Sequence, residues 1–146
     1  VFINGEDVSK AIRTNDMSMR ASSVSAHPMV REKLVEMQQK IAKDKGYILD
    51  GRDIGTVVLP DAEVKVYMIA SVEARAKRRF KEYEEKHIEA DYDEIYQDIE
   101  KRDYQDMNRK TSPLRKADDA KEIDTSDMTI EEVVSAIRNL IQPCIE

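Results

Sequence analysis

The sequence has no tryptophan, one cysteine, two histidines and no long apolar run. A single cysteine, Cys144, excludes a disulfide framework and favours a reducing compartment. Neither His27 nor His87 has Cys or His neighbours at ligand spacing, so we expect no metal site among these residues. No stretch is apolar enough to cross a bilayer and no signal peptide is visible, so the expected location is the cytoplasm.

Charge is abundant, but neither sign dominates strongly. Charged residues make up 37% of the 146 residues, with a net charge of -6. This average field argues against nucleic acid or a membrane surface as a partner, so a phosphate-binding role requires locally clustered arginines. The length and the 40% hydrophobic content predict one modest core in a helix-rich globular domain.

The few glycines and prolines mark the ends of elements in the first third of the chain. Asn4-Gly5 predicts a hairpin within residues 1–7. Because the chain starts at Val1 just ahead of this turn, we expect it to be a piece of a longer protein. Short helices are predicted near residues 7–13 and 17–25, and a longer one from Pro28, with Gly46 as its C′ residue.

Predicted strands and helices alternate over the rest of the chain. Strands are expected at 47–49, 64–69 and 121–125, a loop and short connection at 51–59, and helices at 72–86, 92–110 and after residue 129. Ser71 is the predicted N-cap of one helix, and Thr129 with Glu132 forms a predicted capping box for the last. This alternation predicts an α/β fold with a parallel sheet.

A candidate site follows the predicted strand at 47–49, since ligands bind beyond the carboxyl ends of strands in open α/β sheets. Gly51 and Gly55 permit a tight turn there. Between them, Arg52 offers a guanidinium to phosphate and Asp53 offers an acceptor. An ordinary turn with a local Arg–Asp ion pair accounts for these residue types equally well.

The sequence contains no GxxxxGK[ST] phosphate loop. Residues 46–53 have the glycine spacing, but Arg52-Asp53 replaces the Lys-Ser/Thr pair, and a predicted strand occupies the place of the cradle. We therefore expect the chain to lack a phosphate loop.

One face of the predicted helix at 92–110 changes from apolar to charged. Its members are spaced four, three, four, three: Ile95, Ile99, Arg102, Asp106 and Arg109. This pattern predicts a face that leaves the core and enters a cleft. The alternative is a solvated helix end with an i,i+4 Arg–Asp pair, worth about 0.3 kcal/mol.

Two other helices place positive charge where it needs an explanation. Arg31 lies in the first turn of its helix, where the macrodipole disfavours a cation. An anionic or electron-rich neighbour would offset that cost, but a surface arginine that tolerates it is the commoner explanation. The helix at 72–86 carries a basic cluster: Arg75, Lys77, Arg78, Arg79 and Lys81. Such a cluster suits a segment that closes over polyphosphate, and pairing with neighbouring glutamates is the plain alternative.

These stretches together resemble the bacterial cytidylate kinase family of nucleoside monophosphate kinases. The likeness covers almost the whole chain, and its matching segments are DGRDIGTVVLPDA at 50–62, ASSV at 21–24, PMVR at 28–31, RD at 102–103 and DMNR at 106–109. It implies a three-layer P-loop nucleoside monophosphate kinase-like α/β fold with a parallel sheet. The fold would be incomplete, because the N-terminal strand, phosphate loop and first helix are absent.

The resemblance also implies a division of labour and a reaction. Residues 1–46 would be part of the monophosphate-binding insertion and its connecting helix, and residues 47–146 the core α/β region with a closing lid at about 75–91. The intact protein would transfer the γ-phosphoryl of ATP to CMP or dCMP, with Mg²⁺ held alongside ATP by residues outside this chain. It would be a monomer, whereas the piece alone would bind the monophosphate weakly, would be inactive because it lacks the phosphate loop, and could pair or swap. The competing hypothesis is a non-catalytic, charged helical binding module.

The resemblance further implies roles for the substrate-binding side chains. Ser22, Arg31 and Asp53 would contact cytosine, with Asp53 accepting from the exocyclic amine and so penalising uracil. Arg102 and Asp106 would hold the sugar.

The remaining implied roles concern the phosphates. Arg52 and Arg109 would grip the α-phosphate and the transferred phosphoryl group, while Arg78 and Arg79 would contact ATP from the closing segment. The catalytic set implied in this way is Arg52, Arg78 and Arg109.

Overall fold

The computed structural model describes residues 1–44 and 46–144, which fold as two compact units, Val1–Tyr47 and Ile48–Glu146. Lys45 of the predicted first domain and Ile145 and Glu146 of the predicted second lie outside the described residues. No helix in the described ranges is both long and apolar enough to cross a membrane.

The first unit is a hairpin followed by two helices. Strand β1 (Phe2–Ile3) pairs antiparallel with β2 (Glu6–Asp7), and Asn4 and Gly5 between them both have positive φ, which confirms the predicted turn. Helix α1 (Asn15–Ser25) begins after Thr14, whose hydroxyl accepts from an N–H of the first turn. Helix α2 (Pro28–Ile41) begins at proline, as predicted. The helix expected near 7–13 is only a 3₁₀ turn, Ala11–Arg13.

Helix α2 ends earlier than the end predicted from the position of Gly46. Its C-cap is Ala42, and Ala42–Asp44 continue as a 3₁₀ turn, so Gly46 is not its C′ residue. Gly46 does adopt a left-handed conformation with φ of 75°. A tightened last turn satisfies terminal carbonyls without a glycine, which explains why the glycine is a poor guide to this helix end.

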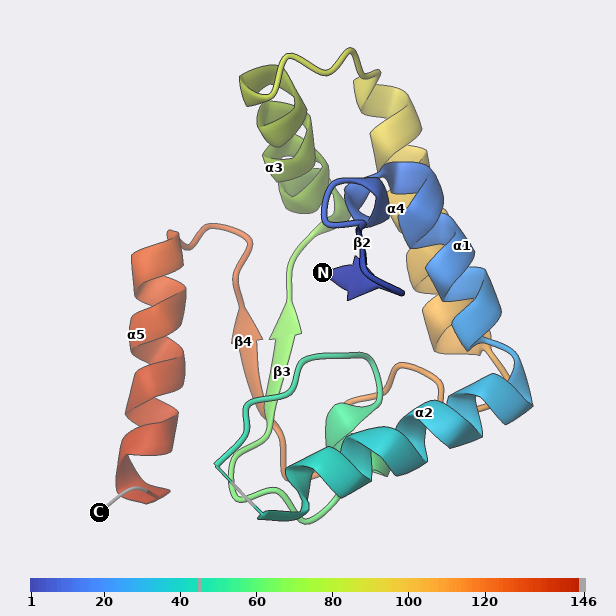
Figure 1. Cartoon of the computed structure of the whole chain (residues 1–146). Helices are drawn as coiled ribbons and strands as arrows, with labels where there is room; N and C mark the ends of the chain where they lie inside the picture. The colour runs from blue at the N-terminus through green and yellow to red at the C-terminus, as the bar shows by residue number, and fades with distance from the viewer. Residues whose placement is uncertain (45, 145–146) are drawn as a thin grey trace. The chain divides into compact units, whose positions relative to one another are not determined.

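The second unit contains a short parallel sheet and three longer helices (Figure 1). Strand β3 (Val66–Ile69) pairs in parallel with β4 (Lys121–Asp124), which confirms both predicted strands and the parallel sheet. The connection between them carries α3 (Val72–Glu85) and α4 (Tyr92–Asn108), and α5 (Ile130–Ile141) follows β4.

Helices α3 and α4 pack side by side as a hairpin with its own apolar core (Figure 1). Ala76 from α3 and Ile95 and Ile99 from α4 are at most 8% exposed. Around them pack half-buried, mostly aromatic side chains, namely Val72, Phe80, Tyr83, Ala90, Tyr92 and Tyr96. The apolar half of the α4 face predicted from sequence is therefore buried against α3.

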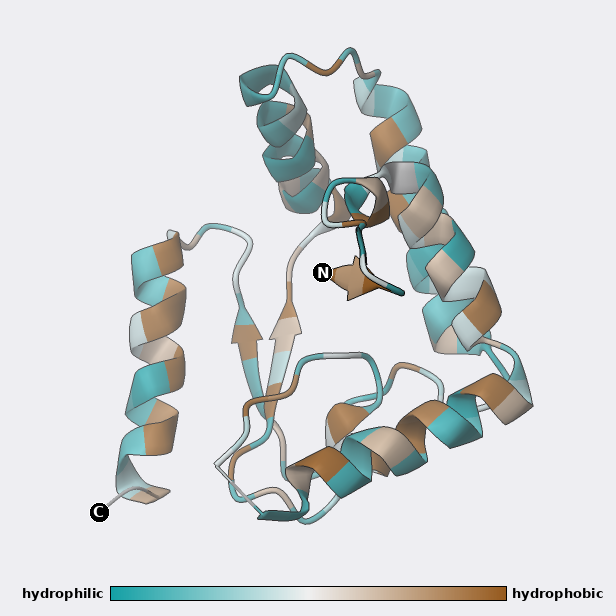
Figure 2. Ribbon diagram, viewed as in Figure 1, coloured by the Kyte–Doolittle hydropathy of each residue, from teal (hydrophilic) through white to brown (hydrophobic). Residues whose placement is uncertain are grey.

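The expected helix signals around α3 and α5 are present. The Ser71 hydroxyl accepts from the Ala74 N–H, and Thr129 and Glu132 form the reciprocal capping box. Helix α5 is amphipathic, with apolar positions recurring along its length in Figure 2. None of its described residues is buried: Ile130 is 78% exposed and Val134 58%.

The predicted buried strand at 47–49 is wrong. Tyr47 is 54% exposed and Ile48 90%, and these residues pair with no strand among those described. An extended apolar segment becomes a strand only where a neighbouring backbone pairs with its N–H and C=O groups, and the parallel sheet of the described residues consists of β3 and β4 alone.

The expected loop and connection at 51–59 contain instead a single π-helical turn, Ile54–Val58. Its closing bonds run from the Val58 and Leu59 N–H groups to the carbonyls of Asp53 and Ile54. Lys65 braces this turn: its Nζ donates to the Pro60 carbonyl and pairs with Asp119 at 2.6 Å. Turns of this type are frequent at functional sites, and this one directly follows Arg52-Asp53.

Candidate functional site

Charged side chains from the 50–55 segment and from the end of α4 form one network. Asp106 Oδ2 accepts from Arg52 Nε at 3.1 Å, and Asp106 Oδ1 accepts from Arg109 Nη1 at 3.4 Å. Asp53 Oδ1 lies 3.9 Å from Arg109 Nη2. Positive and negative groups therefore alternate through this network, in the order Arg52, Asp106, Arg109 and Asp53.

Burial distinguishes the members of this network. Asp53 and Asp106 are each 5% exposed, and the Arg109 side chain is 8% exposed, whereas the Arg52 side chain is 42% exposed. Three fixed charges thus lie in the interior, where their mutual attraction is screened less than at the surface. Arg52, the most exposed of the four, extends the network to the solvent.

The break after α4 explains why Arg109 points inward. Arg109 is the C-cap of α4, and its Nε donates to the Ser112 carbonyl at 2.7 Å. Ser112 has φ of 50°, and Leu114 N–H returns to the Asp106 carbonyl at 2.8 Å. The turn over residues 111–113 therefore folds back over the last turn of α4 and holds the guanidinium in place.

Arg102 lies one turn before Asp106, and charges of both signs act on it: Arg52 and Arg79 lower its pKa, whereas Asp106 and Asp103 raise it. Its Nε is buried and has no hydrogen-bond partner among residues 1–44 and 46–144. Burial lowers the pKa of Arg102, and the positive charge of Arg52 lowers it further. A guanidinium stays protonated regardless, so a buried N–H without a partner favours an incoming anion or hydroxyl oxygen.

The alternative interpretation of this helix face, a solvated helix end with an ion pair between Arg102 and Asp106, is wrong. Asp106 is buried and directs its two oxygens at Arg52 and Arg109, with no hydrogen bond to Arg102. The charged end of the α4 face is therefore an interior network that reaches across the unit, in place of a solvated i,i+4 pair.

Ser22 and Arg31 both belong to the first unit. Ser22 is 9% exposed in α1, and Arg31 Nε donates to the Ser25 carbonyl at 3.0 Å. The Ser25 hydroxyl in turn donates to the Ser22 carbonyl at 3.0 Å. The end of α1 therefore supplies an electron-rich neighbour to Arg31, the less common of the two alternatives considered from the sequence, because helix carbonyls are partly negative there. The meeting of Ser22 and Arg31 with Asp53 around cytosine stays a prediction.

The basic cluster on α3 divides into two kinds of residue. Lys81 pairs with Glu85 on the exposed surface, which matches the alternative of pairing with the following Glu82, Glu84 and Glu85. Lys77 is also exposed, but it pairs with the preceding Glu73. Arg78 instead donates to the carbonyls of Thr125, Ser126 and Met128, in the connection between β4 and α5.

Arg79 is half-buried, and its charge contributes to the lowered pKa of Arg102. Arg79 therefore acts electrostatically on the same region as the network. Contacts of Arg78 and Arg79 with ATP stay predictions.

Asp103 is a charged residue that sequence reasoning missed. It forms a bidentate ion pair with Arg75 of α3, at 2.9 Å from Nη1 to Oδ1 and 2.5 Å from Nη2 to Oδ2. Asp103 lies four residues after the buried Ile99, so it continues the α4 stripe that faces α3. That spacing was available in the sequence.

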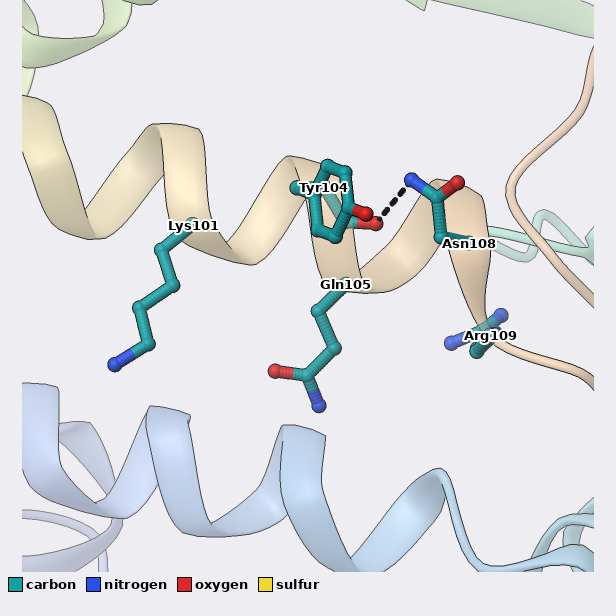
Figure 3. Close-up of a pocket in the computed structure, with 5 residues that line it drawn as sticks. All are labelled: Lys101, Tyr104, Gln105, Asn108 and Arg109. Atoms are coloured by element: carbon teal, nitrogen blue, oxygen red, sulfur yellow. Dashed lines mark hydrogen bonds between the residues drawn. The ribbon is translucent and has the colours of Figure 1, made fainter.

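Figure 3 shows a hollow along α4 lined by Lys101, Tyr104, Gln105, Asn108 and Arg109. The Asn108 side-chain amide donates to the Tyr104 carbonyl at 2.8 Å. Only Arg109 is shared with the network. Among the residues the structure describes, no three of His, Cys, Asp or Glu gather to hold a metal ion.

The family model for cytidylate kinase matches residues 1–143. This chain belongs to the cytidylate kinase family. It is 55% identical to the cytidylate kinase of Enterococcus faecalis over 142 residues, which is 97% of this chain and 63% of the relative. It is 55% identical to that of Lactobacillus johnsonii over 142 residues (97% and 62%), and 52% identical to that of Streptococcus agalactiae serotype III over 146 residues (100% and 64%).

Family membership confirms the resemblance drawn from residues 50–62 and the other matching segments. It also confirms the P-loop nucleoside monophosphate kinase fold, of which this chain shows helices around a parallel sheet. The chain spans a little under two thirds of the length of these cytidylate kinases.

Proposed function

We propose that this chain supplies most of the nucleotide-binding surface of a cytidylate kinase that transfers the γ-phosphoryl of ATP to CMP or dCMP. The observation that carries the proposal is the buried network in which Asp106 joins Arg52 to Arg109. Phosphoryl transfer depends mainly on positioning and on fixed positive charge near the transferred group. A carboxylate that holds two arginines in place provides both.

Within this site the α-phosphate and the transferred phosphoryl group would bind Arg52 and Arg109. Arg109 is held by Asp106 and the Ser112 carbonyl, so little reorganisation is needed when charge develops on the phosphoryl oxygens. The sugar would lie at Arg102 and Asp106, where the buried Arg102 Nε offers a donor.

Cytosine would be recognised by Asp53 with Ser22 and Arg31. The exocyclic amine of cytosine donates a hydrogen bond, whereas uracil presents an acceptor at that position. Asp53 is buried and close to Arg109, so it is held as an acceptor with little freedom to turn away. We propose CMP and dCMP as substrates on this basis, with UMP disfavoured.

Arg78 and Arg79 of the closing segment at about 75–91 would contact ATP, and Mg²⁺ would bind together with ATP. Arg78 now binds carbonyls of the β4–α5 connection, so it must exchange those bonds for phosphate. We propose that residues 1–46 serve the monophosphate and residues 47–146 form the catalytic core, in a monomeric cytoplasmic enzyme. Because the sequence has no GxxxxGK[ST] loop, we propose that the chain alone is inactive.

A fusion tests this function. The chain would be joined to the part of the Enterococcus faecalis relative that the match does not cover, and ADP formation would be followed with CMP, dCMP and UMP. We expect activity with CMP and dCMP in the fusion, and none in the chain alone or in the relative's part alone. A folded fusion that phosphorylates none of the three would contradict the proposal.

A further inference from the structure

The ion pair between Arg75 and Asp103 joins α3, which carries Arg78 and Arg79, to α4, which carries Arg102 and Asp106. Both terminal nitrogens of Arg75 and both carboxylate oxygens of Asp103 take part, with N–O distances of 2.9 and 2.5 Å. Arg75 Nε also donates to the carbonyls of Ala70 and Ser71 at 3.1 and 3.4 Å. The Arg75 fork is thus anchored at the start of α3 before it reaches α4, and bidentate pairs of this kind fix orientation as well as distance.

The pair lies where the apolar seam of the hairpin ends. Ile95 and Ile99 pack against Ala76. Four residues after Ile99, on the side of α4 that faces α3, Asp103 contributes a charged contact with Arg75 in place of an apolar one. The position of the last two turns of α4 relative to α3 therefore depends on this polar contact.

Those two turns carry Arg102, Asp106 and Arg109, and Arg102 lies among charges of both signs. Burial and the positive charges of Arg52 and Arg79 lower its pKa, Asp106 and Asp103 raise it, and its Nε has no hydrogen-bond partner among the described residues. Like charges at close range push apart. An anchor next to Arg102 keeps that guanidinium in place while no ligand is present.

We propose that Arg75 and Asp103 are positioning residues that hold the Arg102 turn of α4 against α3 for binding of a pyrimidine nucleoside monophosphate, an inference that rests on the proposed function. They touch no substrate atoms in this scheme. Their effect is exerted through Arg102 and its neighbours, and it links the helix of Arg78 and Arg79 to the helix of Arg102 and Arg109.

The variant Asp103→Asn tests the pair, with CMP titrated into the chain by calorimetry. Asparagine keeps one acceptor but loses the charge, so we expect the Kd for CMP to rise about tenfold, the scale of one charge-assisted contact. The matched control is Glu73→Gln, which removes the exposed ion pair between Glu73 and Lys77 on α3, the helix that carries Arg75. We expect the control to change the Kd by less than about twofold.

A reciprocal exchange separates positioning from general damage. The double variant Arg75→Asp with Asp103→Arg restores opposite charges and favours an anion in the first turn of α3. We expect it to recover at least part of the affinity that Asp103→Asn loses. If the double variant binds CMP no better than Asp103→Asn, the pair does not act by holding α4 and the inference is overturned.

Hydrogen exchange gives a readout that does not need a ligand. In Asp103→Asn we expect backbone amides at 103–109 to exchange about tenfold faster, with those at 95–99 changed much less, as local opening predicts. Unchanged exchange at 103–109 overturns the inference even where CMP binds. Faster exchange with unchanged CMP affinity also overturns it, since the pair would then be structural only. If the wild-type chain binds no CMP, the proposed function is what fails, and the exchange result still decides whether the pair holds α4.

Discussion

Asp106 is the residue on which the candidate site most depends. Each of its oxygens accepts from a different arginine, and it is 5% exposed. The sequence identified Arg52, Asp53, Arg102, Asp106 and Arg109 as candidates, but it could not give their pairing. Helical spacing favoured Arg102 as the partner of Asp106, whereas the actual partner Arg52 lies 54 residues away, and only the folded chain brings it close.

The variant Asp106→Asn should be strongly destabilising. It leaves the buried Arg109 guanidinium without its countercharge from Asp106, and losing one partner of a buried pair costs about 3 kcal/mol. Urea denaturation of the chain would measure this loss. The matched control is Glu100→Gln, an exposed position on the same helix, which should change stability by less than about 0.5 kcal/mol. Equal effects of the two variants would show that Asp106 contributes no special stability.

The variant Asp53→Ala should narrow the preference for CMP over UMP. Removal of the acceptor for the exocyclic amine is expected to reduce the difference in binding free energy by about 1–3 kcal/mol. Competition between the two nucleotides, measured on the active fusion, checks this. An unchanged preference would remove Asp53 from the base-recognition site.

Arg109→Ala should act mainly on turnover. Arg109 is nearly fully buried and held by Asp106 and Ser112, so its guanidinium is suited to stabilise charge as it develops on the phosphoryl group. Loss of one preorganised donor of this kind lowers kcat by about 100-fold or more. Steady-state kinetics of the fusion would show this. A rise in KM for CMP with kcat unchanged would assign Arg109 to ground-state binding instead.

At the scale of elements, local chemistry predicted the helices better than it predicted the edges of the sheet. Ser71 and the Thr129–Glu132 pair cap helices where expected, because a cap satisfies N–H groups only a few residues away. The strand predicted at 47–49 is not formed, since a strand requires a partner far away in sequence. The π-helical turn at Ile54–Val58 was missed because no residue pattern specifies it.

The capping box of α5 should make stability pH-dependent. The Thr129 N–H donates to the Glu132 carboxylate, and this bond holds the pKa of Glu132 below its ordinary value of 4.5. A lowered pKa in the folded state means that the stabilisation is present above pH 4.5 and is lost as the pH falls through the folded pKa.

The variant Glu132→Gln isolates this contribution, since glutamine keeps an acceptor but does not titrate. Thermal unfolding of both proteins between pH 6 and pH 3 should show the wild type losing more stability than Glu132→Gln on acidification. Other exposed carboxylates with lowered pKa, such as Asp119 and Asp124, are common to both proteins and cancel in the difference. Parallel pH profiles would exclude the capping box as a source of acid sensitivity.

At the scale of the whole molecule, one feature of the sequence indicated the family, and another gave no indication of the phosphate site. The segment at 50–62 was specific enough to indicate the family, which the match over residues 1–143 confirms. The net charge of -6 gave no hint of a phosphate site, because the site depends on arginines gathered from α4 and the segment before the π-helical turn. Average charge describes the surface, whereas recognition of phosphate depends on local geometry.

The most direct test of the central claim is the binding of CMP and UMP to the chain by calorimetry, with Arg102→Met and Arg115→Met compared. Both variants remove one arginine of the second unit, but Arg102 has a buried Nε whereas Arg115 is exposed. The account predicts that CMP binds more tightly than UMP, that Arg102→Met weakens CMP binding about tenfold or more, and that Arg115→Met leaves it nearly unchanged. If neither nucleotide binds at about 1 mM, or if the two variants lose equal affinity for CMP, the account is contradicted.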